Sequence, residues 1–172
     1  MVTASQLLKI TNTRTLYFDI TAFALITFLP AISHIVSVPL YLFEPMSILL
    51  ILSIVHTSRK NSFIIAAALP IISYLLSSHP AFYKVILIAT ELALTVSLFS
   101  YINQRLKNMF VVTVATILIS KVYYYIGKFL LIKLILIEGE LVSTPLYIQG
   151  IVILVLSGYV YFIFNRRDSS LN

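Results

Sequence analysis

The sequence predicts an all-α, polytopic membrane protein with six transmembrane helices. Of its 172 residues 60% are hydrophobic and only 10% are charged, and the mean hydropathy is +1.02. A water-soluble domain with a polar surface does not have this balance. Apolar runs long enough for membrane helices follow one another along most of the chain. Basic residues recur in every second gap between these runs, which indicates an even number of crossings.

The apolar runs define the expected helices and divide the chain into three parts. Residues 1–16 form an N-terminal cytoplasmic segment, residues 17–164 a single transmembrane domain, and residues 165–172 a cytoplasmic tail. The six runs are Tyr17 to Val38, Leu40 to Val55, Phe63 to Leu76, Ala81 to Tyr101, Phe110 to Leu136, and Pro145 to Phe164. The second and third are shorter than the roughly 20 residues that cross a ~30 Å core, so we expect them to pack inside the bundle.

The charges between the runs predict the orientation. Lys and Arg precede the first run and follow the second, fourth and sixth. The other gaps have no Lys or Arg, and they hold acidic residues or histidine instead: Glu44, His79, Glu138 and Glu140. By the positive-inside rule, both termini are cytoplasmic. Pro45, Pro80 and Pro145 stand where helices would begin on the outer face, a position that tolerates proline. Helix starts carry partial positive charge, so this face suits an anionic group.

Four lysines that do not belong to the basic gaps lie inside the expected helices, and two acidic residues join them there: Lys84, Lys121, Lys128 and Lys133, with Asp19 and Glu91. An ionised group at the bilayer centre costs at least about 2.5 to 3.5 kcal/mol on insertion scales, so it normally faces the bundle interior and has a partner. Asp19 and Lys133 lie near helix ends and have a structural interpretation. Glu91 and Lys121 lie near the middle of the fourth and fifth runs, where neither reaches water easily.

Helical spacing puts these residues on two polar faces. Lys84, Glu91 and Thr95 share one face, and Lys121 shares another with Tyr125 and with Lys128. One interpretation is a buried ion pair between Glu91 and Lys121 that fixes packing. The other is an outward-opening pocket in which Lys121 holds an acidic or strongly polar solute while Glu91 orients it. The sequence favours neither.

The connection after the first run is irregular. The chain passes from His34 through Pro39 and Glu44 to Pro45, and this segment could fold back over a pocket. The Tyr123 to Tyr125 run has a packing interpretation, with ring stacking on a bound heterocycle as the alternative. No hydrolytic constellation, metal-binding motif or phosphate-binding loop occurs in the sequence, so we expect neither an enzyme nor a bound cofactor or metal.

Five motifs occur in an order typical of one transporter family: LPAISH, EPM, LPIISYLLSSHP, TEL and TPLYIQGIVIL, beginning at Leu29, Glu44, Leu69, Thr90 and Thr144. In this ordered set, which covers nearly the whole chain, the sequence resembles the substrate-binding S components of energy-coupling-factor (ECF) vitamin transporters. The resemblance implies a six-helix bundle in a prokaryotic inner membrane that captures a vitamin or related micronutrient from outside. It also implies two kinds of partner, a membrane T component and two ATPase subunits, which hydrolyse ATP in place of this chain.

The resemblance also assigns residues to roles. It implies that His34, Glu91, Lys121 and Gln149 line an outward-facing substrate pocket and that Pro45 and Met46 shape the loop over it. The polar faces and the irregular connection add Glu44, Lys84 and Tyr125 to the candidate substrate-binding residues. For the surface that docks the T component the resemblance implies the small residues Ala22, Ala24 and Ala31. A second hypothesis is a small multi-span scaffold of a cell-shape or envelope complex. Such a protein needs no solute pocket, and Glu91 and Lys121 would then form a purely structural pair.

Overall fold

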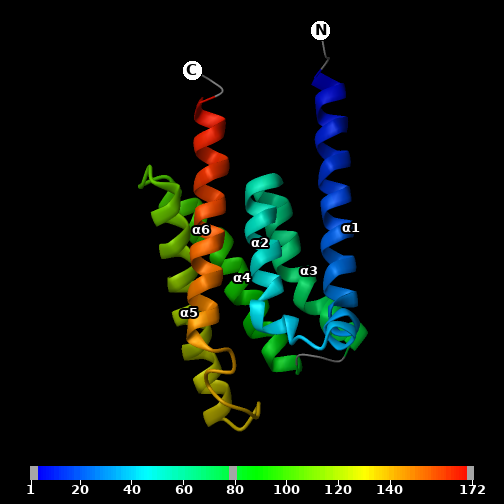
Figure 1. The fold of residues 1–172 in the computed structure, drawn as a ribbon, viewed down its shortest axis with the longest axis vertical. Helices are drawn as coiled ribbons and strands as arrows, with labels where there is room; N and C mark the ends of the chain where they lie inside the picture. The colour runs from blue at the N-terminus through cyan, green and yellow to red at the C-terminus, as the bar shows by residue number, and fades with distance from the viewer. Residues whose placement is uncertain (1–3, 78–80, 170–172) are drawn as a thin grey trace.

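The fold is a bundle of α-helices, seen in the computed structural model of Figure 1. The structure describes the backbone of residues 4–77 and 81–169 and the side chains of residues 13–76 and 81–166. Within these ranges the elements are α1 (Ala4–Val36), the 3-10 helix η1 (Leu40–Phe43), α2 (Pro45–His56), α3 (Arg59–Ser77), α4 (Phe82–Asn103), α5 (Met109–Lys133) and α6 (Leu146–Ser169). No strand occurs in the described ranges, so the predicted all-α class is confirmed.

Local sequence explains where several helices begin. Pro45 opens α2 at the first-turn position, where its missing N–H is harmless. The side chain of Asn108 caps α5 by accepting hydrogen bonds from the backbone N–H groups of Phe110 and Val111, at 3.0 and 3.4 Å. Pro145 directly precedes α6, as predicted. Pro80 and His79 lie outside the described residues. In contrast to the expected start at Tyr17, α1 is already helical from Ala4.

In the described part of the chain, four helices are long and apolar enough to cross a membrane: residues Thr13–Val36 of α1, all of α4 and α5, and Leu146–Arg166 of α6. The chain is therefore a membrane-embedded, multi-pass protein. The 12 residues of α2 extend only about 18 Å, too short for a ~30 Å core. The 19-residue α3, which opens with polar residues, is not among the four. Six crossings thus remain a prediction.

Successive helices run in alternating directions, and both ends of the chain project from the same end of the bundle (Figure 1). The start of α3 and the connection from α4 to α5 lie at this end too, with their basic residues Arg59, Lys60, Arg105 and Lys107. We call it the basic end. The opposite end carries η1, the start of α2 and the connection from α5 to α6. The alternation of charge along the sequence is therefore also a separation in space.

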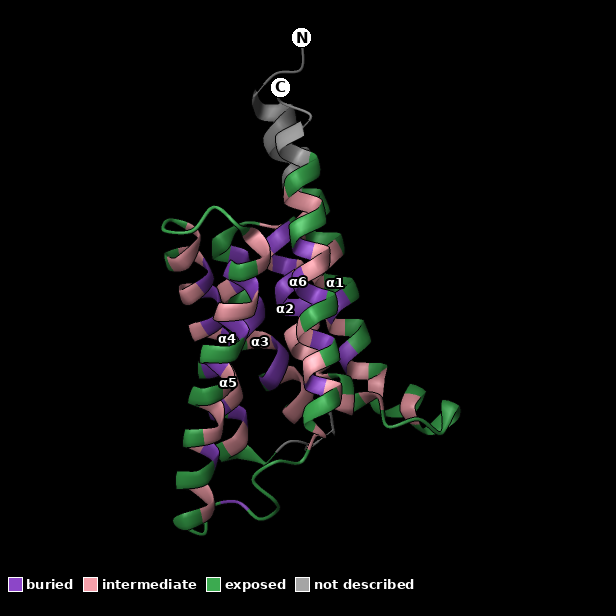
Figure 2. Cartoon of the chain, turned by 60° about the vertical axis from the view of Figure 1, so that its left-hand side comes forward, coloured by how far each residue is buried: buried purple, intermediate pink, exposed green. Residues whose placement is uncertain are grey.

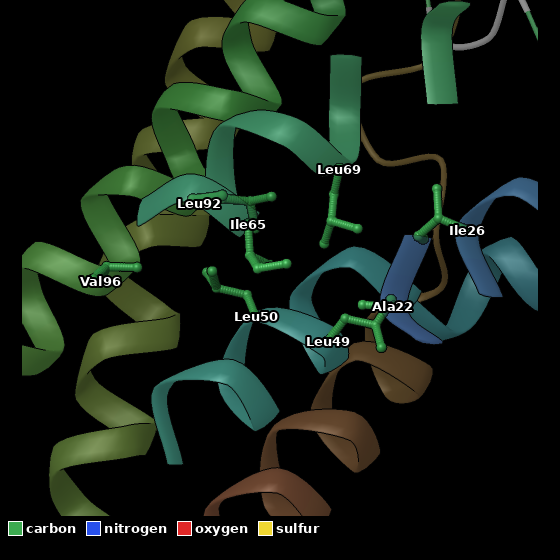
Figure 3. Close-up of a cluster of buried hydrophobic side chains, with 9 residues drawn as sticks. Ala22, Ile26, Leu49, Leu50, Ile65, Leu69, Leu92 and Val96 are labelled. Carbon is green, nitrogen blue, oxygen red and sulfur yellow. The ribbon is translucent and has the colours of Figure 1, made fainter. Parts of the chain in front are cut away.

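The core is centred on α2, which contributes to two clusters of buried side chains. The first cluster (Figure 3) connects the helices α1, α2, α3 and α4, and its members are Ala22, Ile26, Leu49, Leu50, Ile65, Ala66, Leu69, Leu92 and Val96. The second joins α2 to the last three helices through Ile51, Val55, Phe99, Val112, Ile117, Val152, Leu156 and Val160. The expectation that the second run packs inside the bundle is thus confirmed. Outward faces are apolar but exposed (Figure 2), which is the arrangement that lipid requires.

Candidate functional site

Three charged side chains meet in the interior of the bundle, and we call them the charged triad: Glu44, Glu91 and Lys121. The Lys121 Nζ lies 2.7 Å from Oε2 of Glu44 and 3.3 Å from Oε1 of Glu91. The side chains are 12%, 15% and 6% exposed for Lys121, Glu44 and Glu91 respectively. The predicted contact between Glu91 and Lys121 is therefore present. Glu44 joins it from the other side, so that two carboxylates share one ammonium group.

The third member reaches the triad because the chain turns back after α1. We call residues 37–44 the strap. Its first and last residues are both in the left-handed region, Ser37 with φ 55° and Glu44 with φ 53°. This conformation costs a non-glycine residue on the order of 1 kcal/mol. The Ser33 hydroxyl stabilises the turn by donating to the Val38 carbonyl at 2.6 Å and accepting from the Leu40 N–H at 3.2 Å. The strap contacts α1 and α6 through η1.

A small cavity of about 10 Å³ lies next to the triad, enough for roughly one water molecule. Its polar wall consists of Ser47, Thr95 and Ser120 together with Glu91 and Lys121, and its apolar wall comes from Leu50, Ile51, Leu92 and Ile117. The Ser120 hydroxyl is buried and has no hydrogen-bond partner in the described part of the chain. Pockets for organic ligands usually measure 300 to 1,000 Å³, so the site is closed in this conformation.

Aromatic rings connect the triad to a second polar group. Lys121 Nζ lies 5.6 Å from the centroid of the Tyr124 ring, a cation–π contact, and Tyr124 packs edge-on against Tyr125. The Tyr125 hydroxyl accepts a hydrogen bond of 2.5 Å from Nε2 of Gln149, which also donates to the Thr144 carbonyl at 2.8 Å. Gln149 is 5% exposed. Tyr125 and Gln149 thus link α5 to α6, and in the described part of the chain they form no hydrogen bond with the triad.

The two other candidate lysines lie apart from the triad. Lys128 is buried, and its Nζ donates to Oγ of Ser143 in the α5–α6 connection at 3.2 Å. Lys84 of α4 lies near enough to Lys128 to repel its charge. In the described residues no carboxylate forms a salt bridge with either lysine. The two lysines bring positive charge between α4 and α5, offset in part at Lys128 by Glu140, whereas two carboxylates surround the single charge of Lys121.

Five more of the predicted site residues are not part of the triad and do not line its cavity. His34 is exposed at the end of α1, and Met46 packs against the core cluster of α1 to α4. Ala22 belongs to that same core and is 1% exposed, so it is not accessible to a partner. Ala24 and Ala31 are exposed on α1 and remain accessible. Sequence reasoning did not single out Ser120, and it did not separate Tyr124 from its neighbours, because each contact depends on how α4 and α5 pack.

The charged triad and the cavity beside it offer polar groups that can bind a small solute. The described residues contain no group of three or more His, Asp or Glu side chains that could hold a metal ion. The triad offers two carboxylates and an ammonium group, which can form charge-assisted hydrogen bonds to a polar solute. Comparison with protein-family models, with curated proteins and with solved structures finds no match to this chain.

Proposed function

We propose that this chain is the solute-capture subunit of an ECF-type importer and binds a vitamin or related small polar micronutrient. The observation that carries the proposal is the charged triad, in which Lys121 bridges Glu44 of the strap and Glu91 of α4. Ionisable groups are rare in membrane segments because they are costly there, and they commonly mark a solute pathway. An adjacent cavity with an unpartnered Ser120 hydroxyl supports the same interpretation.

In this proposal the strap opens and closes the site. Breaking the contact between Glu44 and Lys121 frees the ammonium group and lets the strap move away from the triad. The solute then takes the place of Glu44, and Glu91 orients it from α4. Irregular backbone is tolerated at membrane depth where it lines such a cavity. The strap is a suitable moving part because left-handed residues at both of its ends make the closed backbone energetically costly.

The finer topology belongs to this proposal. Successive helices alternate in direction (Figure 1). Six crossings follow if α2 and α3 also cross the membrane, with the strap completing the outer half of the bundle beside them. The basic end then faces the cytoplasm with both termini, and the strap faces outward. A prokaryotic inner membrane is the proposed location. Single-cysteine labelling tests the orientation: Glu140→Cys should react with an impermeant maleimide in whole cells, and Lys107→Cys only after lysis.

The partners are a membrane T component and two ATPase subunits, which supply the energy. Their docking surface is proposed on α1, where Ala24 and Ala31 are exposed. Large apolar side chains surround them, including Phe28 at 60% and Ile35 at 83% exposure. Ala22 is excluded from this surface because it is buried in the core. This chain is proposed to bind neither ATP nor another cofactor and to have no enzymatic activity.

The alternative function is a membrane scaffold in which the triad only fixes packing. The closed form of the site favours it, since about 10 Å³ holds no organic solute and all three charged side chains take part in salt bridges with one another. Affinity purification of the tagged protein from its own membranes, followed by mass spectrometry of associated proteins, distinguishes the two. A T component with its ATPases supports the importer. Envelope-synthesis or division proteins in their place would contradict it and support the scaffold.

A further inference from the structure

A larger cavity lies at the basic end of the bundle, away from the charged triad. It measures about 310 Å³ and lies between α2, α3, α4 and α6. Its polar lining comes from Arg59 and Ser62 at the start of α3 and from Ser100, Asn103 and Gln104 at the end of α4. This volume falls within the range of small-molecule sites, which the cavity at the triad does not approach. The solute-capture proposal makes no use of it.

The polar lining suits an anion. The Arg59 guanidinium stacks 5.8 Å from the centroid of the Phe63 ring and has no carboxylate partner among the described residues. The side-chain amides of Asn103 and Gln104 likewise have no hydrogen-bond partner in the described part of the chain, so their N–H groups are free to donate. Arg59 is also the first residue of the 19-residue α3, whose dipole favours negative charge there.

Charge around the cavity reinforces this preference. No Asp or Glu is found among the described residues that line it. Lys60, Arg105 and Lys107 lie at the same end of the bundle and add to its positive field. Asp19 is the one acidic residue in the described part of α1, and its side chain accepts a hydrogen bond from Asn61 at 2.7 Å. Among the described residues that line the cavity, a phosphate would therefore meet a cation and amide donors but no carboxylate.

The remaining wall is apolar and comes from Ile54, Val96, Phe99 and Phe164. A fully hydrated inorganic ion gains nothing from such a wall, whereas a molecule with a glycerol or acyl portion buries apolar surface against it. We propose that this cavity binds the phosphate headgroup of an anionic amphiphile, with a membrane phospholipid as its source. Arg59 contacts the phosphate, the amides of Asn103 and Gln104 contact its oxygens or the glycerol hydroxyls, and the apolar wall holds the first carbons of the chains.

The test uses the full-length protein in nanodiscs that contain equal amounts of phosphatidylglycerol and phosphatidylcholine. The protein is released into detergent, and native mass spectrometry counts the lipids that stay bound. We expect one retained phosphatidylglycerol in preference to phosphatidylcholine. Arg59→Gln should lower that retention about tenfold, because it removes a charge-assisted hydrogen bond. Equal retention of the two lipids by the unaltered protein would overturn the proposal.

Arg105→Gln is the matched control. Arg105 lies at the same end and stacks 5.5 Å from the centroid of the Tyr101 ring, but it does not line the cavity. It should leave retention unchanged, and an equal loss in both variants would mean that charge at this end acts without a defined site. Ser100→Leu fills the cavity without changing charge and should also reduce retention. If it does not, the cavity is not the binding site, whether or not Arg59→Gln folds.

Competition identifies the source of the phosphate. Glycerol 3-phosphate is added at millimolar concentration during release from the nanodisc. Retention of phosphatidylglycerol under this condition supports a lipid ligand that depends on its acyl chains. If glycerol 3-phosphate displaces the lipid from the unaltered protein, and this displacement is lost in Arg59→Gln, the lipid assignment is overturned in favour of a soluble phosphate ester. None of these outcomes depends on the charged triad, so failure here leaves the solute-capture proposal intact, and the reverse holds as well.

Discussion

Replacing Lys121 by Met removes the cation that Glu44 and Glu91 share in the described part of the chain. Both carboxylates lie within 3.3 Å of the same Nζ atom, so the bound oxygens are at most about 6 Å apart. At an effective dielectric constant of ~20, two like charges at that separation repel by roughly 3 kcal/mol. Measured losses for breaking a buried ion pair on one side are about 3 to 5 kcal/mol. We expect Lys121→Met to lower the free energy of unfolding by an amount in this range.

The assay is equilibrium unfolding in mixed micelles, followed by circular dichroism as the fraction of denaturing detergent increases. Lys133→Met is the matched control, because Lys133 is a lysine of the same helix that is exposed near its end. Its replacement should change stability by no more than about 0.5 kcal/mol. The triple variant Glu44→Gln, Glu91→Gln, Lys121→Met removes all three charges together and should recover most of the loss.

Two results would refute this reasoning. If Lys121→Met is no less stable than Lys133→Met, the triad is not a buried charge cluster. If the triple variant is as unstable as Lys121→Met, the loss comes from packing around the lysine stem and not from uncompensated carboxylates. The double variant Glu44→Gln, Glu91→Gln separates these two causes further. It keeps the lysine stem but leaves the buried ammonium group of Lys121 without a carboxylate partner, so it should be destabilised like Lys121→Met.

Two further predictions test helix packing and the strap. A Cβ atom on Gly127 would lie 2.4 Å from Cδ1 of Leu87, so Gly127→Ala should cost about 1 to 3 kcal/mol, and Leu87→Ala should cost less in that background than alone. Gly158 has open space around its Cβ position, so Gly158→Ala should stabilise the protein by roughly 0.5 to 1 kcal/mol. Equal effects on stability at both glycines would contradict the close packing of Gly127 against Leu87. The chain has no cysteine, so Ser47→Cys gives a single thiol beside the small cavity. Glu44→Gln should raise its labelling rate by an impermeant maleimide about tenfold, and an unchanged rate would mean that Glu44 does not hold the strap.

Hydropathy and helix-start residues were sufficient to predict most of the fold. Six apolar runs correspond to six helices in the described residues, and Pro45 begins a helix as its backbone chemistry requires. Helical spacing also predicted that Glu91 and Lys121 could meet, because each lies near the middle of its helix on a polar face. These are local properties, and the sequence contains them directly. The bounds of α1 were missed because its polar N-terminal residues still form helix.

The rest depends on tertiary closure. Glu44 enters the triad only because the strap turns through two left-handed residues, and nothing in the sequence requires Ser37 to adopt that conformation. His34, four residues after a proline in a transporter-like motif, is exposed and takes no part in the triad. The cavity at the basic end is formed by the ends of four helices. No periodic pattern predicts such a cavity, since its lining residues are far apart in the chain.

The most direct test of the solute-capture proposal is mass spectrometry of small molecules bound to the protein. The tagged chain and the triple variant Glu44→Gln, Glu91→Gln, Lys121→Met are purified gently from the same host membranes, and their extracts are compared. The proposal predicts one small polar compound that co-purifies with the unaltered protein and is absent from the folded variant. If no compound co-purifies, or if both proteins carry the same amount of it, the triad does not bind a solute and its charges only stabilise the bundle.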